Sequence, residues 1–297
     1  MANIPVAAMI WMAWLRVARA LALALVVLAL GAFVARQFNL LDKQLVFFPS
    51  KVIQSSPGDL GLAYEEVRFE TEDGVDLHGW FVPGTEPATE AITLLWFHGN
   101  AGNVGDRVEN LLLLNQAVGV NIFIFDYRGY GLSEGSPSEK GMYLDAEAAI
   151  AYLRSRPEVT NDSDLVLFGR SIGAAVAVEM ATRHDIRGLI LESPFTSLRA
   201  MARLTHPVLS RIVPFGLVVQ SRYESLGKMP HVNSPVLVIH GKADETVPVE
   251  MGLELFEAAS YPKRLHLVDG AGHNDVYLFG GDEYFNAIKA FIEGDDG

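Results

Sequence analysis

The fold of this chain is decided by one stretch, Gly169-Arg170-Ser171-Ile172-Gly173. It follows an apolar run at 165–168 and precedes a run of small apolar residues at 174–178. A buried strand, a serine with glycines two residues before and after it, and a helix together form a nucleophile elbow. This strained turn makes the serine hydroxyl project from the end of the sheet, and side chains at the glycine positions would collide with neighbouring backbone. The short pattern also arises by chance in tight strand–helix turns, but the flanking strand and helix favour the elbow.

An acidic residue and a histidine follow this serine in the chain order that such an elbow predicts. Asp244 lies just past a β-branched apolar run at 235–241, which indicates a buried strand. His273 lies on a glycine-rich loop after another apolar run, at 265–268. Catalytic groups in open α/β sheets gather at the carboxyl ends of the strands, so we expect Ser171, Asp244 and His273 to meet there.

These three residues match the needs of nucleophilic catalysis. A serine hydroxyl is a poor nucleophile at neutral pH, so an imidazole has to accept its proton and return it to the leaving group. A carboxylate fixes the imidazole tautomer and stabilises the imidazolium. We assign Ser171 as nucleophile, His273 as general base and acid, and Asp244 as the orienting carboxylate. A purely structural role is the alternative for His273. Three other carboxylates compete with Asp244: Glu245, Asp269 and Asp275.

Acyl transfer also needs backbone N–H donors that stabilise the oxyanion, each worth roughly 3 to 4 kcal/mol. The amide after the nucleophile, that of Ile172, is expected to supply one. The second is expected from the loop after an earlier strand, and the apolar run at 92–97 precedes such a loop. We assign this donor to the amide of Asn100, with that of Ala101 as the alternative. His98, at the start of the loop, is interpreted as structural.

Further motifs accompany these residues along nearly the whole chain. They are His98-Gly99-Asn100-Ala101-Gly102-Asn103, Asp126-Tyr127-Arg128-Gly129-Tyr130-Gly131, Glu192-Ser193-Pro194-Phe195, His240-Gly241 with Asp244, Gly272-His273-Asn274-Asp275, and Leu45-Val46-Phe47-Phe48-Pro49-Ser50 after an apolar N-terminus. With the elbow, this set resembles the α/β-hydrolase superfamily, and within it the membrane-anchored α/β-hydrolase-domain serine hydrolases. The resemblance implies an α/β-hydrolase fold, with a mostly parallel eight-stranded sheet covered by helices on both faces. It also implies esterase, lipase or thioesterase chemistry, without fixing the substrate.

The remaining pattern agrees with such a sheet. Asp73-Gly74 between two alternating runs predicts a β-hairpin, after which strands and helices alternate. Asp126 and Glu192, at the ends of two predicted strands, are interpreted as structural. Further elements are predicted as strands at 121–126 and 188–192 and as helices at 140–154, 252–259 and 284–293. The glycines at 129, 131 and 135 do not form a phosphate-binding loop, because no Gly-Lys-Ser/Thr follows them.

Composition sets the outer bounds. The 297 residues are 50% hydrophobic, enough for one large α/β domain plus an extra segment. The absence of cysteine excludes disulfides and a thiol nucleophile, and the eight scattered histidines do not suggest a metal site. A net charge of −13 argues against a nucleic-acid partner. Because a Ser–His–Asp set needs neither metal nor nucleotide, no cofactor is expected.

Residues 1–43 are basic and apolar, and we interpret them as a membrane anchor and linker that precede a catalytic domain at 44–297. The 19 positions at 17–35 are close to the roughly 20 that span a bilayer, provided that Arg19 extends toward the interface. Tryptophans beside arginines just before this run are typical of a membrane interface. The lipid bilayer is therefore an expected partner of the N-terminal helix.

A cleavable signal peptide is the alternative for this segment. The candidate cleavage sites are poor, because Phe33 or Leu30 stands where a small residue is preferred. Basic residues flank the apolar run on both sides in nearly equal number, so the positive-inside rule barely favours one orientation in the membrane. We expect a cytoplasmic N-terminus and a catalytic domain on the non-cytoplasmic side.

A small cap is expected at 194–235, the usual place for one in this superfamily. Apolar residues cluster there at 198–204, 207–209 and 212–219. A cap with an apolar face suits an acyl chain and argues against a strongly charged substrate. The alternative is that these residues simply pack on the sheet.

The predicted function is that of a serine hydrolase of the carboxylic-ester type, which cleaves acyl esters, with lipid-derived esters as candidates, through an acyl-enzyme. An acyl-protein thioesterase or a serine peptidase would use the same three residues, so the sequence leaves these alternatives open. A membrane-tethered scaffold without catalysis is a more remote alternative, because such a protein would be free to lose any of the three residues.

Overall fold

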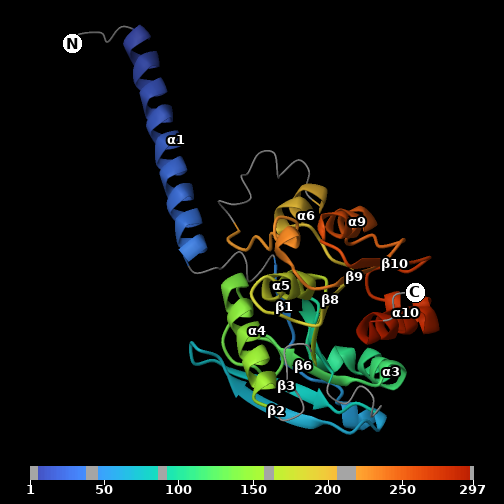
Figure 1. Ribbon diagram of the computed structural model, residues 1–297. Helices are drawn as coiled ribbons and strands as arrows, with labels where there is room; N and C mark the ends of the chain where they lie inside the picture. The colour runs from blue at the N-terminus through green and yellow to red at the C-terminus, as the bar shows by residue number, and fades with distance from the viewer. Residues whose placement is uncertain (1–5, 38–45, 86–91, 157–163, 206–218, 295–297) are drawn as a thin grey trace.

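One eight-stranded sheet organises the part of the chain that the structure describes (Figure 1). The computed structural model describes residues 6–37, 46–85, 92–156, 164–205 and 219–294. The sheet strands are β2 (Glu65–Glu70), β3 (Asp76–Val82), β4 (Thr93–Phe97), β6 (Asn121–Asp126), β7 (Leu165–Arg170), β8 (Gly188–Glu192), β9 (Val236–Gly241) and β10 (Lys263–Val268). Their order is β10-β9-β8-β7-β4-β6-β3-β2. β3 runs antiparallel to its neighbours β2 and β6, and the other neighbouring pairs are parallel. The predicted mostly parallel sheet is confirmed.

A second, two-stranded sheet lies next to the loop after β4. β1 (Phe48–Pro49) and β5 (Ala101–Gly102) pair in parallel, and Phe48 is opposite Ala101. The backbone N–H of Ser50 continues this pairing by donating to the carbonyl of Gly102 at 3.0 Å. The segment that precedes β2 is thereby attached to the loop that carries Asn100, one of the two predicted oxyanion donors.

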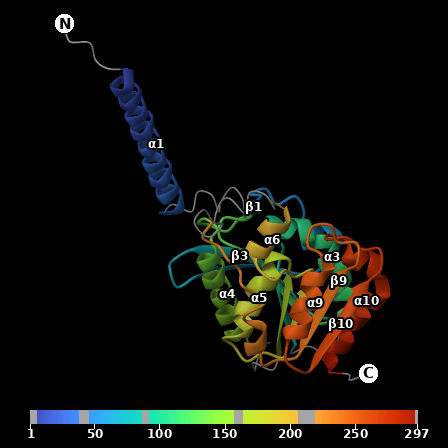
Figure 2. The ribbon, with the colours of Figure 1, turned by 90° about the horizontal axis from the view of Figure 1, so that it is seen from above.

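Helices cover both faces of the central sheet, as predicted (Figure 2). Successive strand residues point to opposite faces, so Leu95 and Leu94 enter different cores. One core is covered by α4 (Glu139–Arg154), α5 (Ile172–Ala181) and α9 (Val249–Ala258). The other is covered by α3 (Val108–Val118) and α10 (Val276–Glu293).

The predicted helix at 284–293 begins too late in the chain. α10 starts at Val276, and a backbone kink at Gly281, with φ 48° and ψ −137°, separates its first turns from the rest. The two adjacent glycines interrupt the apolar pattern there, whereas packing of Val276 into the core holds the earlier turns in place. Short 3-10 helices complete the described elements at η1 (Pro57–Leu60), η3 (Val104–Arg107) and η5 (Met229–His231).

The elbow between β7 and α5 has the predicted geometry. Ser171 has φ 55° and ψ −117°, an uncommon backbone conformation for a residue with a side chain. A Cβ atom at Gly169 would lie 2.5 Å from the Cα atom of Ala174. A Cβ atom at Gly173 would lie 2.0 Å from the carbonyl oxygen of Phe97. The two glycines therefore allow α5 to start close against the neighbouring strand β4.

Replacing Gly173 by alanine is expected to lower the free energy of unfolding by at least about 3 kcal/mol, because backbone atoms of β4 would have to move. Chemical denaturation monitored by circular dichroism measures this change. Gly227→Ala is the matched control, since nothing lies within 4 Å of a Cβ atom there, and its effect should stay within about 1 kcal/mol. Equal losses in both variants would contradict close packing at the elbow.

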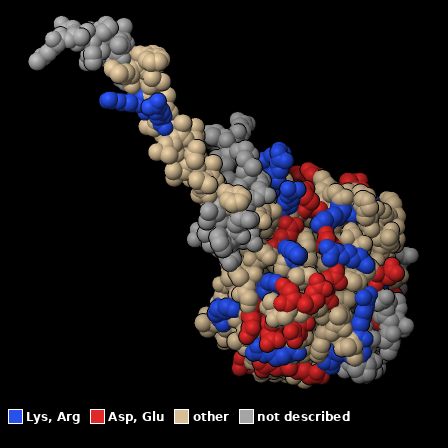
Figure 3. Space-filling view, turned by 90° about the vertical axis from the view of Figure 1, so that its left-hand side faces the viewer, with Lys and Arg blue, Asp and Glu red and all other residues tan. Residues whose placement is uncertain are grey.

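The N-terminal helix α1 (Val6–Gln37) is continuous and stands apart from the rest of the described chain (Figure 1). Its stretch Trp14–Gly31 has a mean hydropathy of 1.9, is long enough to cross a membrane, and is not buried against the protein. Figure 3 shows mostly uncharged surface along α1 and charges of both signs over the rest of the chain. A membrane anchor and a signal sequence both produce such a helix.

The expected cap is described only in part. α6 (Leu198–Thr205) carries Leu198 and Met201 on the side that packs against the core, while Leu204 is exposed. Residues 206–218, which include the predicted apolar clusters at 207–209 and most of 212–219, lie outside the described residues. The cap remains a prediction for that stretch.

Candidate active site

The structure brings Ser171, His273 and Asp244 together at the carboxyl ends of β7, β10 and β9. The Nε2 atom of His273 lies 3.1 Å from the Oγ atom of Ser171, and its Nδ1 atom lies 2.7 Å from the Oδ2 atom of Asp244. The Asp244 side chain is fully buried, whereas the imidazole of His273 keeps 12% of its surface exposed. This geometry lets the serine hydroxyl donate to Nε2 while Nδ1–H donates to the carboxylate.

Several donors hold the Asp244 carboxylate in its charged form. Its Oδ1 atom accepts hydrogen bonds from the backbone N–H groups of Thr246 and Val247, at 2.9 and 2.8 Å. The Nε2 atom of His240 lies 3.3 Å from Oδ2. Burial alone would raise the pKa of this carboxyl, but the hydrogen bonds from His240 and His273 outweigh it and lower the pKa well below its ordinary value. Asp244 is therefore ionised throughout the neutral range.

The competing carboxylates have other partners. Glu245 is exposed, and Asp269 pairs with Lys242 at 2.6 Å on the surface. The Oδ1 atom of Asp275 accepts a hydrogen bond from the backbone N–H of Gly272 at 2.7 Å, which shapes the turn around His273. Asp244 is the carboxylate that contacts the imidazole.

Arg170 ties the histidine loop to the elbow, a role that the sequence did not suggest. Its guanidinium donates to the backbone carbonyl of His273 and to the side-chain oxygen of Asn274, both at 3.0 Å. Its Nε atom lies 3.1 Å from the Oε1 atom of Glu192, whose Oε2 atom accepts a hydrogen bond from Tyr284 at 2.5 Å. Glu192 is fully buried, so its structural interpretation agrees with its place in this network.

The candidate oxyanion donors lie beside the serine. Asn100 and Ile172 line the same cavity as Ser171. The side chain of Asn100 is fixed at both ends, because its amide nitrogen donates to the carbonyl of Val46 and its oxygen accepts from Tyr130 at 3.0 Å. The sequence did not predict this bracing, which holds the loop after β4 in place.

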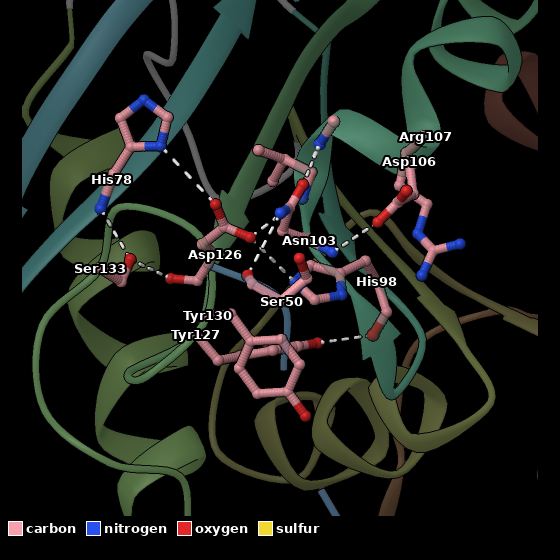
Figure 4. A network of polar contacts seen from close by, with 12 residues as sticks. Ser50, His78, His98, Asn103, Asp106, Arg107, Asp126, Tyr127, Tyr130 and Ser133 are labelled. Carbon is pink, nitrogen blue, oxygen red and sulfur yellow. Dashed lines mark hydrogen bonds and ion pairs between the residues drawn. The ribbon is translucent and has the colours of Figure 1, made fainter. Parts of the chain in front are cut away.

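A buried polar network centred on Asp126 supports that loop from behind (Figure 4). The Oδ1 atom of Asp126 accepts a hydrogen bond from the backbone N–H of Val104 at 2.9 Å and lies 3.7 Å from Nε2 of His98. The backbone carbonyl of His98 accepts a hydrogen bond from Tyr127 at 3.1 Å. His98 is fully buried and contacts neither Ser171 nor His273 through a hydrogen bond, in agreement with its structural interpretation.

Burial lowers the pKa of His98 to about 4, although the neighbouring Asp126 carboxylate acts in the opposite direction. The unfolded chain takes up this proton near pH 6.5, so the folded state loses stability as the pH falls from 6.5 to 4. The loss from this group is on the order of 3 kcal/mol. Urea unfolding at several pH values should show a flatter dependence for His98→Asn than for the wild type.

The exposed His231 provides the control for this titration, and His231→Asn should keep the wild-type dependence on pH. An unchanged slope in His98→Asn would contradict the assignment of the acid sensitivity to His98.

A cavity of about 580 Å³ opens above the serine. This volume lies in the range of small-molecule sites. Its lining residues fall into two groups by their chemistry, which we call the apolar wall and the polar wall. The apolar wall consists of Val46, Ile172, Phe195, Leu198, Met201 and Val247, and the polar wall of Asn100, Asp106, Arg107, Arg170, Thr246, His273 and Asn274. In the described ranges, no group of three or more His, Cys, Asp or Glu side chains is arranged to hold a metal ion.

This chain is similar to known proteins in its sequence and in its fold. A family model described as serine aminopeptidase, S33, matches residues 89–227. The protein bem46 of Schizosaccharomyces pombe is 34% identical over 278 residues, which cover 92% of this chain and 91% of that protein. Alpha/beta hydrolase domain-containing protein 17C of Xenopus laevis is 37% identical over 233 residues, which cover 77% and 70%. The solved structure of the Pyrococcus furiosus esterase Pf2001 superposes with a TM-score of 0.68 at 22% identity, covering 84% of this chain and 98% of that one.

Proposed function

Because this chain belongs to the α/β-hydrolase superfamily, as its relatives show, we propose that it is a serine hydrolase that cleaves carboxylic acyl esters through an acyl-enzyme. The single observation that carries this proposal is the hydrogen-bonded chain from Ser171 through His273 to Asp244, with distances of 3.1 and 2.7 Å. The fold it shares with a solved esterase supports the same chemistry.

In the proposed reaction, the Oγ atom of Ser171 attacks the ester carbonyl carbon while its proton moves to Nε2 of His273. The backbone N–H groups of Asn100 and Ile172 stabilise the oxyanion that forms. Collapse of this intermediate breaks the bond to the alcohol, which takes the proton from Nε2. Water then repeats the sequence on the acyl-enzyme and releases the acid. Asp244 stays ionised and stabilises the imidazolium in both halves.

The lining of the cavity favours an ester over the amine-bearing substrate of an aminopeptidase. A protonated amino group requires a carboxylate in the pocket. Among the described lining residues, Asp106 is the one acidic side chain, and its carboxylate caps the turn at Asn103. Arg107 and Arg170 both line the cavity and would repel an ammonium group.

The N-terminal helix fits a membrane anchor in this proposal. Its apolar stretch Trp14–Gly31 spans a bilayer, and the interfacial tryptophans Trp11 and Trp14 are 67% and 70% exposed. Residues 44–297 then form the catalytic domain, with a cap at 194–235 that shields the acyl chain. An anchored enzyme with an apolar wall beside its nucleophile suits acyl chains drawn from lipids or acylated molecules.

Hydrolysis of p-nitrophenyl esters from acetate to palmitate tests the proposed activity. The apolar wall of the cavity predicts a higher kcat/KM for medium acyl chains than for acetate, since each buried methylene group contributes about 0.8 kcal/mol. Strong preference for acetate would contradict an acyl site on this wall. Folded wild-type protein that is silent across the whole series would overturn the ester assignment, and thioester and amide substrates of the same acyl length would then be compared.

A further inference from the structure

The polar wall of the cavity contains a cation that the proposed reaction does not use. Arg107 ends η3 and lines the cavity together with Ser171 and His273. Its guanidinium donates to the backbone carbonyl of Ala101. Within the described residues it has no carboxylate within ion-pair distance, and its buried Nε atom has no hydrogen-bond partner. In Figure 4 the guanidinium makes no contact with the network around Asp126.

Other arginines with little exposed surface are neutralised by a carboxylate. Arg128 pairs with Asp145 at 2.7 Å, and Arg156 pairs with Glu65 at 2.8 Å. Arg170, the second arginine of the cavity, pairs with Glu192, and its Nη2 atom donates to the histidine loop. The charge of Arg170 is therefore balanced by a buried carboxylate, whereas Arg107 has no paired carboxylate among the described residues and keeps an unpaired Nε donor.

The surroundings of Arg107 disfavour its charge in the absence of a ligand. Burial lowers its pKa, and the positive charge of nearby Arg170 lowers it further. The carboxylate of Asp106 acts in the opposite direction, but it is exposed and accepts a hydrogen bond from the backbone N–H of Asn103. A half-buried guanidinium without a paired anion is costly, and an anion bound to it relieves this cost.

The chemistry of the lining residues assigns the two parts of an ester. The acyl chain suits Phe195 and the α6 side chains Leu198 and Met201, whereas Arg107 belongs to a separate element, η3, and suits the alcohol part. We propose that Arg107 binds an anionic group, a phosphate or a carboxylate, on the alcohol part of the substrate. This inference rests on the proposed ester hydrolysis. It departs from the expectation, drawn from the apolar cap, that the substrate is not strongly charged.

Matched substrate pairs test this assignment in the full-length protein. The first pair differs in the alcohol part: 1-octanoylglycerol and 1-octanoylglycerol 3-phosphate. The second differs at the far end of the acyl part: p-nitrophenyl octanoate and the mono-p-nitrophenyl ester of octanedioic acid. The wild type should prefer the anionic member of the first pair and the neutral member of the second. Arg107→Gln should lower kcat/KM for the phosphate-bearing ester about 10- to 100-fold and leave both neutral esters within about 3-fold.

Two variants separate recognition of an anion from a structural role. Arg107→Lys keeps the charge and should restore part of the activity on the phosphate-bearing ester. Arg199→Gln removes an exposed arginine of α6 that does not line the cavity, and it should behave like the wild type on all four esters. Glycerol 3-phosphate should compete with p-nitrophenyl octanoate in the wild type and more weakly in Arg107→Gln. Thermal unfolding checks that each variant is folded.

Several results would overturn the role of Arg107. If Arg107→Gln lost the same fraction of kcat/KM on charged and neutral esters, the side chain would only hold the backbone carbonyl of Ala101 in place. A loss confined to the acyl-side pair would exclude the alcohol part, and a wild-type preference for 1-octanoylglycerol would exclude an anion site. In each case the neutral esters are still hydrolysed, so the proposed function stands. Failure of the proposed ester hydrolysis would give a different result: folded wild-type protein would hydrolyse none of the four esters.

Discussion

Ser171→Ala is expected to reduce ester hydrolysis by about 10⁴-fold or more, the largest effect of any single substitution in this chain. The acyl-enzyme cannot form without the Oγ atom, which lies 3.1 Å from Nε2 of His273. The variant should remain folded, because the neighbouring turn is held by backbone hydrogen bonds, from Ser171 to Glu192 at 2.9 Å and from Ala174 to Ser171 at 3.0 Å. Initial rates on p-nitrophenyl esters measure the loss.

A fluorophosphonate probe gives a second reading of the same prediction. Attack by the serine oxygen on phosphorus displaces fluoride and leaves a covalent adduct, which peptide mass spectrometry locates. The adduct should be on Ser171 in the wild type and absent from Ser171→Ala. The exposed Ser136 supplies the control, and Ser136→Ala should retain wild-type activity and labelling. Undiminished hydrolysis by folded Ser171→Ala would exclude Ser171 as the nucleophile.

Asp244→Asn should reduce kcat by about 10⁴-fold while the fold is preserved. The Oδ1 atom accepts backbone hydrogen bonds from Thr246 and Val247, and an asparagine oxygen can accept both. The amide nitrogen would replace the oxygen that lies 2.7 Å from Nδ1 of His273. It can only donate there, so the imidazole would carry its proton on Nε2 and could no longer accept the serine proton.

Glu245→Gln is the matched control for this substitution, because it makes the same chemical change at the adjacent, exposed position. Its kcat should remain within about 3-fold of the wild type. Circular dichroism and thermal unfolding establish that both variants are folded. The acid assignment would be wrong if Glu245→Gln lost activity while Asp244→Asn retained it.

Local sequence patterns were sufficient to predict individual strands and the hairpin, whereas the eight-stranded sheet was what the family resemblance implied. The strands at 121–126 and 188–192 have the predicted bounds, and Gly74 has the left-handed φ of 78° that a tight hairpin turn requires. The elbow was predictable for the same reason, since its strand, glycines and helix are consecutive. The start of α10 was not, because the kink at Gly281 interrupts the pattern while tertiary packing keeps the preceding turns helical.

The hydrogen bonds that hold the candidate site in place could not be predicted from the sequence, because they join distant parts of the chain. Arg170 reaches the loop of His273, 103 positions later, and Tyr284 reaches Glu192 across 92 positions. Nothing in the residues next to Arg170 signals this contact. Chain order and strand ends predicted which residues would meet, whereas long-range hydrogen bonds determine how firmly they are held.

The pairing of β1 with β5 joins the segment at 46–50 to the loop that lines the cavity. Val46, the first described residue after α1, lines the cavity itself, and its carbonyl accepts a hydrogen bond from the Asn100 side chain. A displacement of residues 46–50 is therefore expected to move the loop of Asn100, one of the two proposed oxyanion donors. A form cut after Ser50 would keep Ser171, His273 and Asp244 yet lose Val46 from the lining of the cavity. A fragment designed to keep the proposed activity should therefore include Val46.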